Sequence, residues 1–340
     1  MASLPKSYKA AVFEKANDPL TIKDVPLQRP STGQVLVKVL ACGVCGSEEG
    51  VRSGAFGNAF PIVPGHEVIG DVVEVGDGEK KWKVGDRVGG PWHGGHDGTC
   101  KQCNRGQFQM CQNAAVNGVS KDGGFAEYVL LRTEATVRVP KEVDPAEYAP
   151  ILCAGITVFN SIRKLQITPG DIVAVQGLGG LGHLAVQYAN KMGYKVVALS
   201  SGDSKRDFAK KLGAHEYINT SSDDPVKKLM EMGGASLIVC TAPNPKAISP
   251  LTGGLEPGGK VLILSPCGGV EINSVDLIMK AVSVCGFPSG HALDSEEAIA
   301  FTQLHGIKCM IEKFPLKDAQ KAYEHMSSGK ARFRAVLVTE

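Results

Sequence analysis

Side chains able to bind a metal ion or carry a proton recur in three short segments of the chain. They are Cys45 and Ser47 in Cys-Gly-Ser-Glu, His66 and Glu67 in Gly-His-Glu, and Cys153 in Leu-Cys-Ala-Gly. Two thiolates and one imidazole form a zinc site with three protein ligands, which leaves the fourth position open for a water or a substrate oxygen. A glycine motif typical of dinucleotide binding follows Cys153. An open zinc beside a nicotinamide can move a hydride to or from a carbonyl carbon, so these residues predict carbonyl–alcohol redox chemistry.

The glycine motif is Gly-x-Gly-x-x-Gly, and it follows a predicted strand and opens a predicted helix. Gly177 permits the tight turn, Gly179 lets the backbone approach a pyrophosphate, and Gly182 lets the helix pack closely. A lone motif of this kind is often only a turn, but here strands and helices alternate after it. We therefore expect a dinucleotide on this loop, with its anion at the helix N-terminus. The binding residues of the loop are predicted to be Gly177, Gly179, Gly180, Leu181 and Gly182.

The residues after the second strand of this region indicate which nucleotide is bound. NAD enzymes place Asp or Glu at the end of that strand to hold the ribose 2′-hydroxyl, whereas this chain has Ser200. Without a carboxylate there, a 2′-phosphate is not repelled. The residues that could hydrogen-bond or pair with it are Ser200, Ser201, Lys205 and Arg206. The nearby acidic Asp203 argues against a bound 2′-phosphate. Basic residues at the start of a helix, such as Lys205 and Arg206, are also usually only exposed to solvent. On balance the sequence favours NADP(H) over NAD(H).

Length and composition fit a two-domain enzyme without a nucleic-acid or membrane partner. The 340 residues exceed one typical core, and 37 basic against 35 acidic residues give a net charge of only +2. No apolar stretch is long enough to span a membrane, and the first residues do not resemble a secretory signal. Of the ten cysteines, Cys100, Cys103 and Cys111 cluster at metal-ligand spacing. We therefore expect reduced thiols and a cytoplasmic protein.

Hydrophobic patterning predicts an α/β fold in two parts. Residues up to about 140 form short strands separated by glycine and proline turns, as in Gln34–Leu40, Val68–Val75 and Phe125–Leu131. A helical pattern then begins at Asp144-Pro145 and reaches Leu165. Six strands alternate with helices after it and predict a doubly wound parallel sheet. These strands are Ile172–Gln176, Lys195–Leu199, Glu216–Ile218, Leu237–Cys240, Val261–Leu264 and Val282–Cys285.

The C-terminal residues return to a mixed pattern. It predicts helices near Ser295–Leu304 and Lys317–Met326 and a last strand at Phe333–Val338. We therefore expect a six-stranded Rossmann domain, residues 154–287, inserted between two parts of the first domain, residues 1–153 and 288–340.

The full pattern resembles the zinc-dependent medium-chain alcohol dehydrogenases. Residues 65–70, Gly-His-Glu-Val-Ile-Gly, followed by Gly76, match most of that family's signature. The domain order, the glycine loop and the Arg332-Phe-Arg334 ending also match, so the resemblance covers essentially the whole chain. The serines and basic residues after the second strand are most similar to the cinnamyl-alcohol-dehydrogenase-like, NADP-using branch. The resemblance implies a mainly β, GroES-like catalytic domain, an aldehyde or alcohol as small-molecule substrate, and a homo-oligomer, either a dimer or a tetramer.

The resemblance also implies a role for each residue of the first metal site. Cys45, His66 and Cys153 would bind the catalytic zinc, and the Glu67 carboxylate would lie just behind them in the same site. Ser47 would exchange a proton with the substrate oxygen.

Further positions follow from the same resemblance, and two depart from it. Thr157 would touch the nicotinamide, and Arg334 would reach the pyrophosphate. Glu48 replaces the usual aspartate that orients the ligand histidine, so it lengthens that side chain by one methylene. Gly50 stands where several relatives carry a histidine that passes the proton to solvent, so the proton path beyond Ser47 must end in water or another group.

A second, structural zinc is implied by the family's Cys-x2-Cys-x2-Cys-x7-Cys lobe. In this chain the first position of that pattern is Asp97, followed by Cys100, Cys103 and Cys111. Three thiolates and one carboxylate can still form a tetrahedral site. His96 is a rival for the fourth ligand, and a metal-free lobe is the other alternative. We expect two zinc ions per chain.

These observations predict a zinc-dependent alcohol dehydrogenase or aldehyde reductase that uses NADP(H). One alternative is an NAD(H)-dependent enzyme of the same fold. A polyol dehydrogenase often has Glu in place of the third thiolate, and Cys153 argues against it. A zinc-free quinone or enoyl reductase would lack the Cys45, His66 and Cys153 set. A non-catalytic scaffold would be indicated by loss of a ligand or of the glycine loop, and both are present in the sequence.

Overall fold

The computed structural model describes residues 4–339 and divides them into two compact units. The first unit contains the residues up to Ile156, Ser289–Leu304, and the residues from Lys308 onward. The second contains Thr157–Pro288 and His305–Ile307. All ten cysteines are free thiols. Within residues 4–339, the helices are too short or too polar to cross a membrane.

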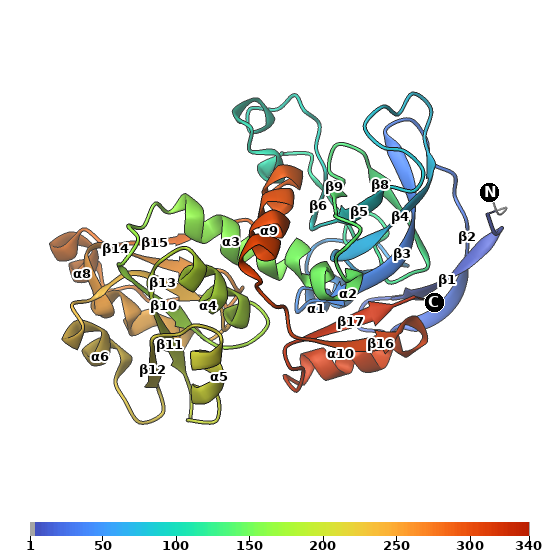
Figure 1. The fold of residues 1–340 in the computed structure, drawn as a ribbon. Helices are drawn as coiled ribbons and strands as arrows, with labels where there is room; N and C mark the ends of the chain where they lie inside the picture. Colours follow the sequence, from blue (N-terminus) through green and yellow to red (C-terminus); the bar gives the residue numbers. More distant parts are fainter. Residues whose placement is uncertain (1–3, 340) are drawn as a thin grey trace. The chain divides into compact units, whose positions relative to one another are not determined.

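A seven-stranded sheet built around β3 (Gln34–Val44) organises the first unit (Figure 1). β3 pairs antiparallel with β4, β8 and β17, so strands from both ends of the chain meet on it. This sheet confirms the mainly β character that was predicted for the first unit. Its other strands are β4 (Val68–Val75), β5 (Arg87–Gly90), β8 (Tyr128–Arg132), β9 (Val137–Arg138), β16 (Ile311–Pro315) and β17 (Arg334–Val338). Two small sheets join β1 (Ser7–Val12) with β2 (Thr21–Pro26), and β6 (His93–Gly95) with β7 (Ala115–Val116).

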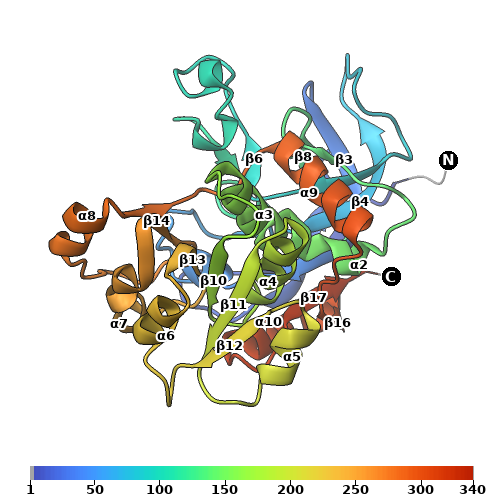
Figure 2. The ribbon, with the colours of Figure 1, turned by 60° about the vertical axis from the view of Figure 1, so that its left-hand side comes forward.

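A six-stranded parallel sheet forms the second unit, in the order β12-β11-β10-β13-β14-β15 (Figure 1), and Figure 2 shows β10 to β14 from another side. The predicted doubly wound sheet is therefore confirmed. The order reverses beside β10, and ligands of such sheets bind at that switch point, outside the carboxyl ends of the strands. The strands are β10 (Ile172–Gln176), β11 (Lys195–Ser200), β12 (Glu216–Asn219), β13 (Ala235–Cys240), β14 (Leu255–Ile263) and β15 (Ser283–Gly286).

The helical segment predicted from Asp144 to Leu165 is present but interrupted. Asp144 caps α2 (Pro145–Tyr148) by accepting a hydrogen bond from the Ala146 N–H, and proline occupies the first helical position as expected. A 3-10 turn follows, and Cys153 then leaves helical geometry (φ −131°, ψ −72°) before α3 (Ala154–Lys164) begins. The interruption therefore places Cys153 in irregular backbone between two helical segments.

Five of the remaining helices alternate with the strands of the second unit, as predicted. They are α4 (Gly182–Lys191), α5 (Arg206–Lys211), α6 (Pro225–Glu231), α7 (Pro245–Ile248) and α8 (Ser274–Lys280). α9 (Ala292–His305) and α10 (Ala319–Ser327) correspond to the two helices predicted near the C-terminus, and the short α1 (Glu48–Arg52) was not predicted. Each unit has its own core. Val37, Val68 and Phe125 lie in the first core, and Ala174, Ile238 and Val261 lie in the second.

Candidate active site

Strand pairing brings Cys45 of the first predicted metal site close to His66 and Glu67. Cys45 follows the last residue of β3, and His66 and Glu67 precede the first residue of β4. These strands are antiparallel, with Cys42 opposite Val68, so the end of β3 lies beside the start of β4. The ligand atoms of Cys45, His66, Glu67 and Cys153 all lie within 4.8 Å of one another. The structure therefore gathers four predicted site residues into one group that could hold a metal ion.

The two thiols of this group differ in their tendency to ionise. Their sulfur atoms are 3.8 Å apart. The hydrogen bond from Cys153, together with Arg334 and His66, holds the pKa of Cys45 well below its usual value despite burial. The same hydrogen bond and burial raise the pKa of Cys153. Ser47 Oγ lies 3.6 Å from Cys45 Sγ on a partly exposed side chain, so its hydroxyl is next to the group.

Glu48 supports the group from behind. Its Oε1 lies 3.0 Å from His66 Nδ1, and its Oε2 accepts a hydrogen bond of 2.8 Å from the backbone N–H of Cys45. Burial disfavours a charged imidazole, but the Glu48 carboxylate raises the pKa of His66 well above its usual value. Both side chains are fully buried. One carboxylate therefore fixes the ring of one predicted ligand and the backbone of another, so the longer Glu48 side chain reaches the histidine.

Glu67 is held by Arg334, which the sequence assigned to the cofactor pyrophosphate. Arg334 Nη2 donates to Glu67 Oε1, and Arg334 is only 4% exposed. Burial raises the pKa of Glu67 to about 7, although Arg334 opposes that shift. Gly43 on β3 is required here, because a Cβ at that position would lie 1.8 Å from Glu67 Oε2. The structure therefore places Arg334 against the metal-binding group of the first unit, a contact that the sequence reasoning missed.

An aromatic ring occupies the space beside Gly50. A Cβ at Gly50 would lie 2.4 Å from the Phe56 ring, so no side chain fits there while Phe56 keeps its position. Phe56 contacts Trp92 edge to face with ring centroids 5.6 Å apart, and Trp92 contacts His66 in the same way at 4.8 Å. Aromatic side chains therefore form a continuous series of contacts from His66 in the metal-binding group to the space beside Gly50.

The second predicted metal site also comes together. The ligand atoms of Asp97, Cys100, Cys103 and Cys111 lie within 4.8 Å of one another. Asp97 Oδ1 accepts hydrogen bonds from the Thr99 and Cys100 N–H groups, which fold its carboxylate toward the thiols. Backbone hydrogen bonds also lower the pKa of Cys100 to about 7, which favours a thiolate.

His96, the rival fourth ligand, is engaged elsewhere. Its ring stacks on Phe108 with centroids 4.3 Å apart and on His93 at 5.2 Å. One of its ring nitrogens lies 3.3 Å from His93 Nε2. The geometry of this lobe therefore favours Asp97 over His96.

The glycine loop of the second unit has the form expected for dinucleotide binding. It connects β10 to α4, and Gly177 has a positive φ of 90°. A Cβ at Gly182 would lie 1.9 Å from the Gly177 carbonyl oxygen, so only glycine lets the helix approach. A Cβ at Gly179 would meet no atom within 4 Å, which leaves open space beside the backbone. Thr157 lies in the first part of α3 and is partly exposed.

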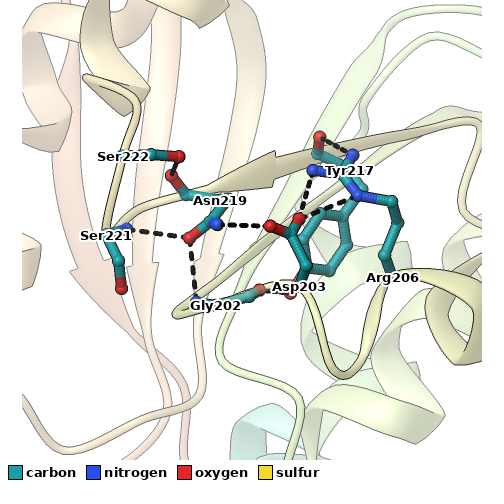
Figure 3. Close-up of polar contacts among 7 residues, drawn as sticks. All are labelled: Gly202, Asp203, Arg206, Tyr217, Asn219, Ser221 and Ser222. Atoms are coloured by element: carbon teal, nitrogen blue, oxygen red, sulfur yellow. Dashed lines mark hydrogen bonds and ion pairs between the residues drawn. The ribbon is translucent and has the colours of Figure 1, made fainter.

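The turn after β11 arranges its charged residues in two directions. Ser200 is the last residue of β11 and is 8% exposed, whereas Ser201 is exposed. Lys205 Nζ donates to the carbonyl of Leu178 in the glycine loop at 3.3 Å. Arg206 instead pairs with Asp203 at 2.5 Å, on the side of β12 (Figure 3). The three-residue spacing of Asp203 and Arg206 was the available sequence signal for this pair.

Two family models match the chain. Residues 31–141 match the alcohol dehydrogenase GroES-like domain, and residues 180–303 match the zinc-binding dehydrogenase model. Among curated proteins, the alcohol dehydrogenase patD of Penicillium expansum is 56% identical over 336 residues, which cover 99% of each chain.

Solved structures also resemble the chain over nearly its full length. A cinnamyl alcohol dehydrogenase of Sorghum bicolor has 29% identity and a TM-score of 0.88, covering 98% of each chain. The acetophenone reductase of Geotrichum candidum, solved in complex with NAD, has 27% identity and a TM-score of 0.88. The match covers 99% of this chain and 98% of the reductase.

Proposed function

Because the chain belongs to the zinc-binding medium-chain alcohol dehydrogenases, we propose that it interconverts an aldehyde and its alcohol with NADP(H) at a catalytic zinc. Family membership makes the chain an oxidoreductase that acts on alcohols. The observation that carries the finer proposal is the group of Cys45, His66, Glu67 and Cys153, whose ligand atoms lie within 4.8 Å. Two thiols and an imidazole are donors that zinc prefers, so the residues fit the ion.

Each residue around this group has a proposed task. Cys45, His66 and Cys153 would hold the zinc, and Glu48 fixes the ring of His66. Arg334 bonds to Glu67 and would keep its carboxylate close to the bound ion. The predicted contact of Arg334 with the pyrophosphate stays a prediction.

Ser47 is the proposed proton carrier. When bound, zinc supplies Lewis-acid polarisation of the substrate oxygen and the nicotinamide supplies or accepts the hydride. During reduction the Ser47 hydroxyl donates its proton to the substrate oxygen, and during oxidation it accepts that proton. Phe56 fills the space beside Gly50, so no side chain at that position can take the proton onward. We propose that Ser47 passes its proton to water during oxidation and regains one from water during reduction. Thr157 is the proposed contact for the nicotinamide ring.

The preference for NADP(H) is supported by the turn after β11. The fold alone does not choose the nucleotide, because the structurally similar acetophenone reductase was solved with NAD. Ser200 occupies the strand end where a carboxylate would hold a ribose 2′-hydroxyl and repel a 2′-phosphate. Lys205 Nζ lies at the glycine loop, where a nearby phosphate can pair with it. The open space beside Gly179 fits the pyrophosphate.

Ser200→Asp should convert the preference to NADH. The new carboxylate would repel the 2′-phosphate and accept a hydrogen bond from the ribose 2′-hydroxyl. We expect the ratio of kcat/KM for NADPH over NADH to fall about 100-fold, as for loss of one charge-assisted contact and gain of another. Initial rates with both nucleotides measure this ratio, and Ser200→Thr is the matched control. An unchanged ratio in Ser200→Asp would contradict the assignment of Ser200.

We also propose a structural zinc held by Asp97, Cys100, Cys103 and Cys111, which gives two zinc ions per chain. The buried or half-buried thiols and the folded-in carboxylate of Asp97 support this ligand set. The zinc would close the loop between β6 and β7, because all four ligands lie in that connection.

Asp97→Ala should reduce the zinc content from two ions per chain to one and lower the melting temperature. Loss of one ligand opens the tetrahedral site, and loss of the ion removes its contribution to folding. Metal content is measured by plasma mass spectrometry, with His96→Ala as the control. If His96→Ala loses the ion and Asp97→Ala keeps it, the fourth ligand is His96.

Transfer of deuterium tests the proposed reaction itself. NADPH that carries deuterium at both positions of nicotinamide C4 is incubated with the zinc-replete protein and an aldehyde, and the alcohol is analysed by mass spectrometry. We expect one deuterium on the carbinol carbon, because the hydride passes directly from cofactor to carbon. An alcohol that carries only hydrogen from water would contradict direct transfer.

A further inference from the structure

The two basic residues after β11, Lys205 and Arg206, point to different partners. Lys205 Nζ is bonded to the Leu178 carbonyl, so its charge is held at the glycine loop. All three nitrogens of the Arg206 guanidinium are engaged elsewhere. Its Nε and Nη2 donate to Asp203 Oδ1 at 2.9 and 2.5 Å, and its Nη1 donates to the Tyr217 carbonyl at 3.2 Å.

Arg206 is also held by a ring. Its guanidinium carbon lies 4.7 Å from the centre of the Tyr217 ring, on the first part of β12. A cation over an aromatic face is attracted to it, and the planar guanidinium stacks well there. Arg206 is therefore fixed against β12, away from the glycine loop contact made by Lys205.

Asp203 is built into the same network from its other side. Its Oδ2 accepts a hydrogen bond of 3.0 Å from Asn219 Nδ2, and Asn219 Oδ1 accepts from the backbone N–H groups of Gly202 and Ser221 (Figure 3). Asn219 is only 7% exposed and lies opposite Ser200 in the sheet. The Tyr217 hydroxyl also donates to the Gly202 carbonyl at 2.6 Å. Hydrogen bonds therefore hold the backbone of the turn against β12 and fix the position of the Asp203 carboxylate.

The pair has a consequence for charge. Arg206 holds the pKa of Asp203 below its usual range, so the carboxylate is ionised at neutral pH. The opposite charges of Asp203 and Arg206 cancel at short range. A 2′-phosphate that approached Arg206 would therefore also be repelled by the Asp203 carboxylate. Lys205 instead directs its Nζ to the Leu178 carbonyl of the glycine loop.

We propose that Asp203 is a specificity-determining residue that limits the preference for NADP(H), because it keeps Arg206 as its own partner. Lys205 and Ser200 then contact the 2′-phosphate, and Arg206 serves to neutralise Asp203. This inference rests on the proposed binding of the nucleotide at the glycine loop. It differs from the sequence-based prediction, in which both Lys205 and Arg206 could pair with the 2′-phosphate.

Calorimetric titration of the zinc-loaded protein with NADP⁺ and with NAD⁺ tests this division without measuring turnover. Asp203→Asn should tighten NADP⁺ binding about tenfold at low ionic strength, since it removes a negative charge and releases Arg206. It should leave NAD⁺ binding within about twofold, because NAD⁺ lacks the added phosphate. Lys205→Gln and Arg206→Gln form a matched pair, and we expect the first to weaken NADP⁺ binding about tenfold more than the second.

The double variant separates the two possible roles of Arg206. Arg206→Gln alone leaves the Asp203 carboxylate uncompensated, so NADP⁺ binding should weaken. Adding Asp203→Asn removes that carboxylate and should restore NADP⁺ binding to at least the unmodified level. If the double variant stays as weak as Arg206→Gln, Arg206 itself contacts the phosphate and the proposal is overturned.

The remaining outcomes are also decisive. Unchanged or weaker NADP⁺ binding in Asp203→Asn overturns the proposal, and a selective loss of NAD⁺ binding shows that Asp203 holds the ribose instead. Melting curves check folding, and Asp203→Ser is the second variant if Asp203→Asn is unstable. A natural preference for NAD⁺ would contradict the proposed function. The proposed effect of Asp203 would still be tested, because the measured quantity is the ratio of the affinities for NADP⁺ and NAD⁺. That ratio is compared between Asp203→Asn and the unmodified protein.

Discussion

Cys153→Ala is expected to abolish the activity by removing the catalytic zinc. The sulfur lies 3.8 Å from that of Cys45, and both belong to the group whose ligand atoms lie within 4.8 Å. With only Cys45 and His66 left as strong zinc ligands, the ion should dissociate. A Lewis acid of this kind stabilises the transition state by several kcal/mol, so kcat/KM should fall by at least about 10³-fold.

Zinc content distinguishes loss of the ion from general damage to the fold. In Cys153→Ala the content should fall from two ions per chain to one, because the group at Asp97 is separate. Cys42→Ala is the matched control, since Cys42 is a fully buried thiol on β3 outside both groups. It should keep both ions and most of the activity. Full zinc content in Cys153→Ala would show that Cys153 is not a ligand.

Ser47→Ala is expected to lower kcat strongly while both zinc ions stay bound. Ser47 Oγ lies beside Cys45 Sγ, where the substrate oxygen would approach the ion. A positioned proton donor typically contributes a factor of about 10² to 10⁴, and we expect a loss in this range. Phe56 fills the space beside Gly50, so the nearby relay position offers no replacement side chain.

Ser47→Thr is the control for this prediction, because it keeps a hydroxyl at the same position. We expect it to recover a large part of kcat. The pH dependence of kcat should also steepen in Ser47→Ala, since the proton must then come directly from water. Equal kcat in Ser47→Ala and the unmodified protein would assign the proton to another donor.

Much of the candidate site could be predicted from the sequence because its chemistry is carried by rare residue types at short spacing. Cys100 and Cys103 are three residues apart, and His66 and Glu67 are adjacent. The glycine loop is also local, since a turn, a close approach and a helix start are all specified within one short segment. Alternation of apolar strands and helices was sufficient for the order of elements in the second unit, as the six-stranded parallel sheet confirms.

The contacts that the sequence did not reveal depend on tertiary pairing or on side-chain direction. Arg334 and Glu67 are 267 positions apart and meet because β17 and β4 both pair with β3. Phe56 beside Gly50 depends on how a loop folds back. The direction of Arg206 toward β12 depends on Tyr217, which belongs to the next strand.

One strand was missed for a different reason. β16, Ile-Glu-Lys-Phe-Pro, is a short edge strand with two charged residues and a proline. Charges and proline are common on edge strands, where they prevent pairing with other chains. The hydrophobic alternation that identifies a buried strand is therefore weak in this segment.

The most direct test of the central claim is the initial rate of aldehyde reduction with NADPH and with NADH, before and after zinc chelation. Aliphatic and aromatic aldehydes should both be tried, and zinc should then be added back. We expect faster turnover with NADPH than with NADH, loss of activity on chelation, and recovery when zinc is restored. Undiminished turnover in fully zinc-depleted protein would contradict a zinc-dependent reaction at Cys45, His66 and Cys153.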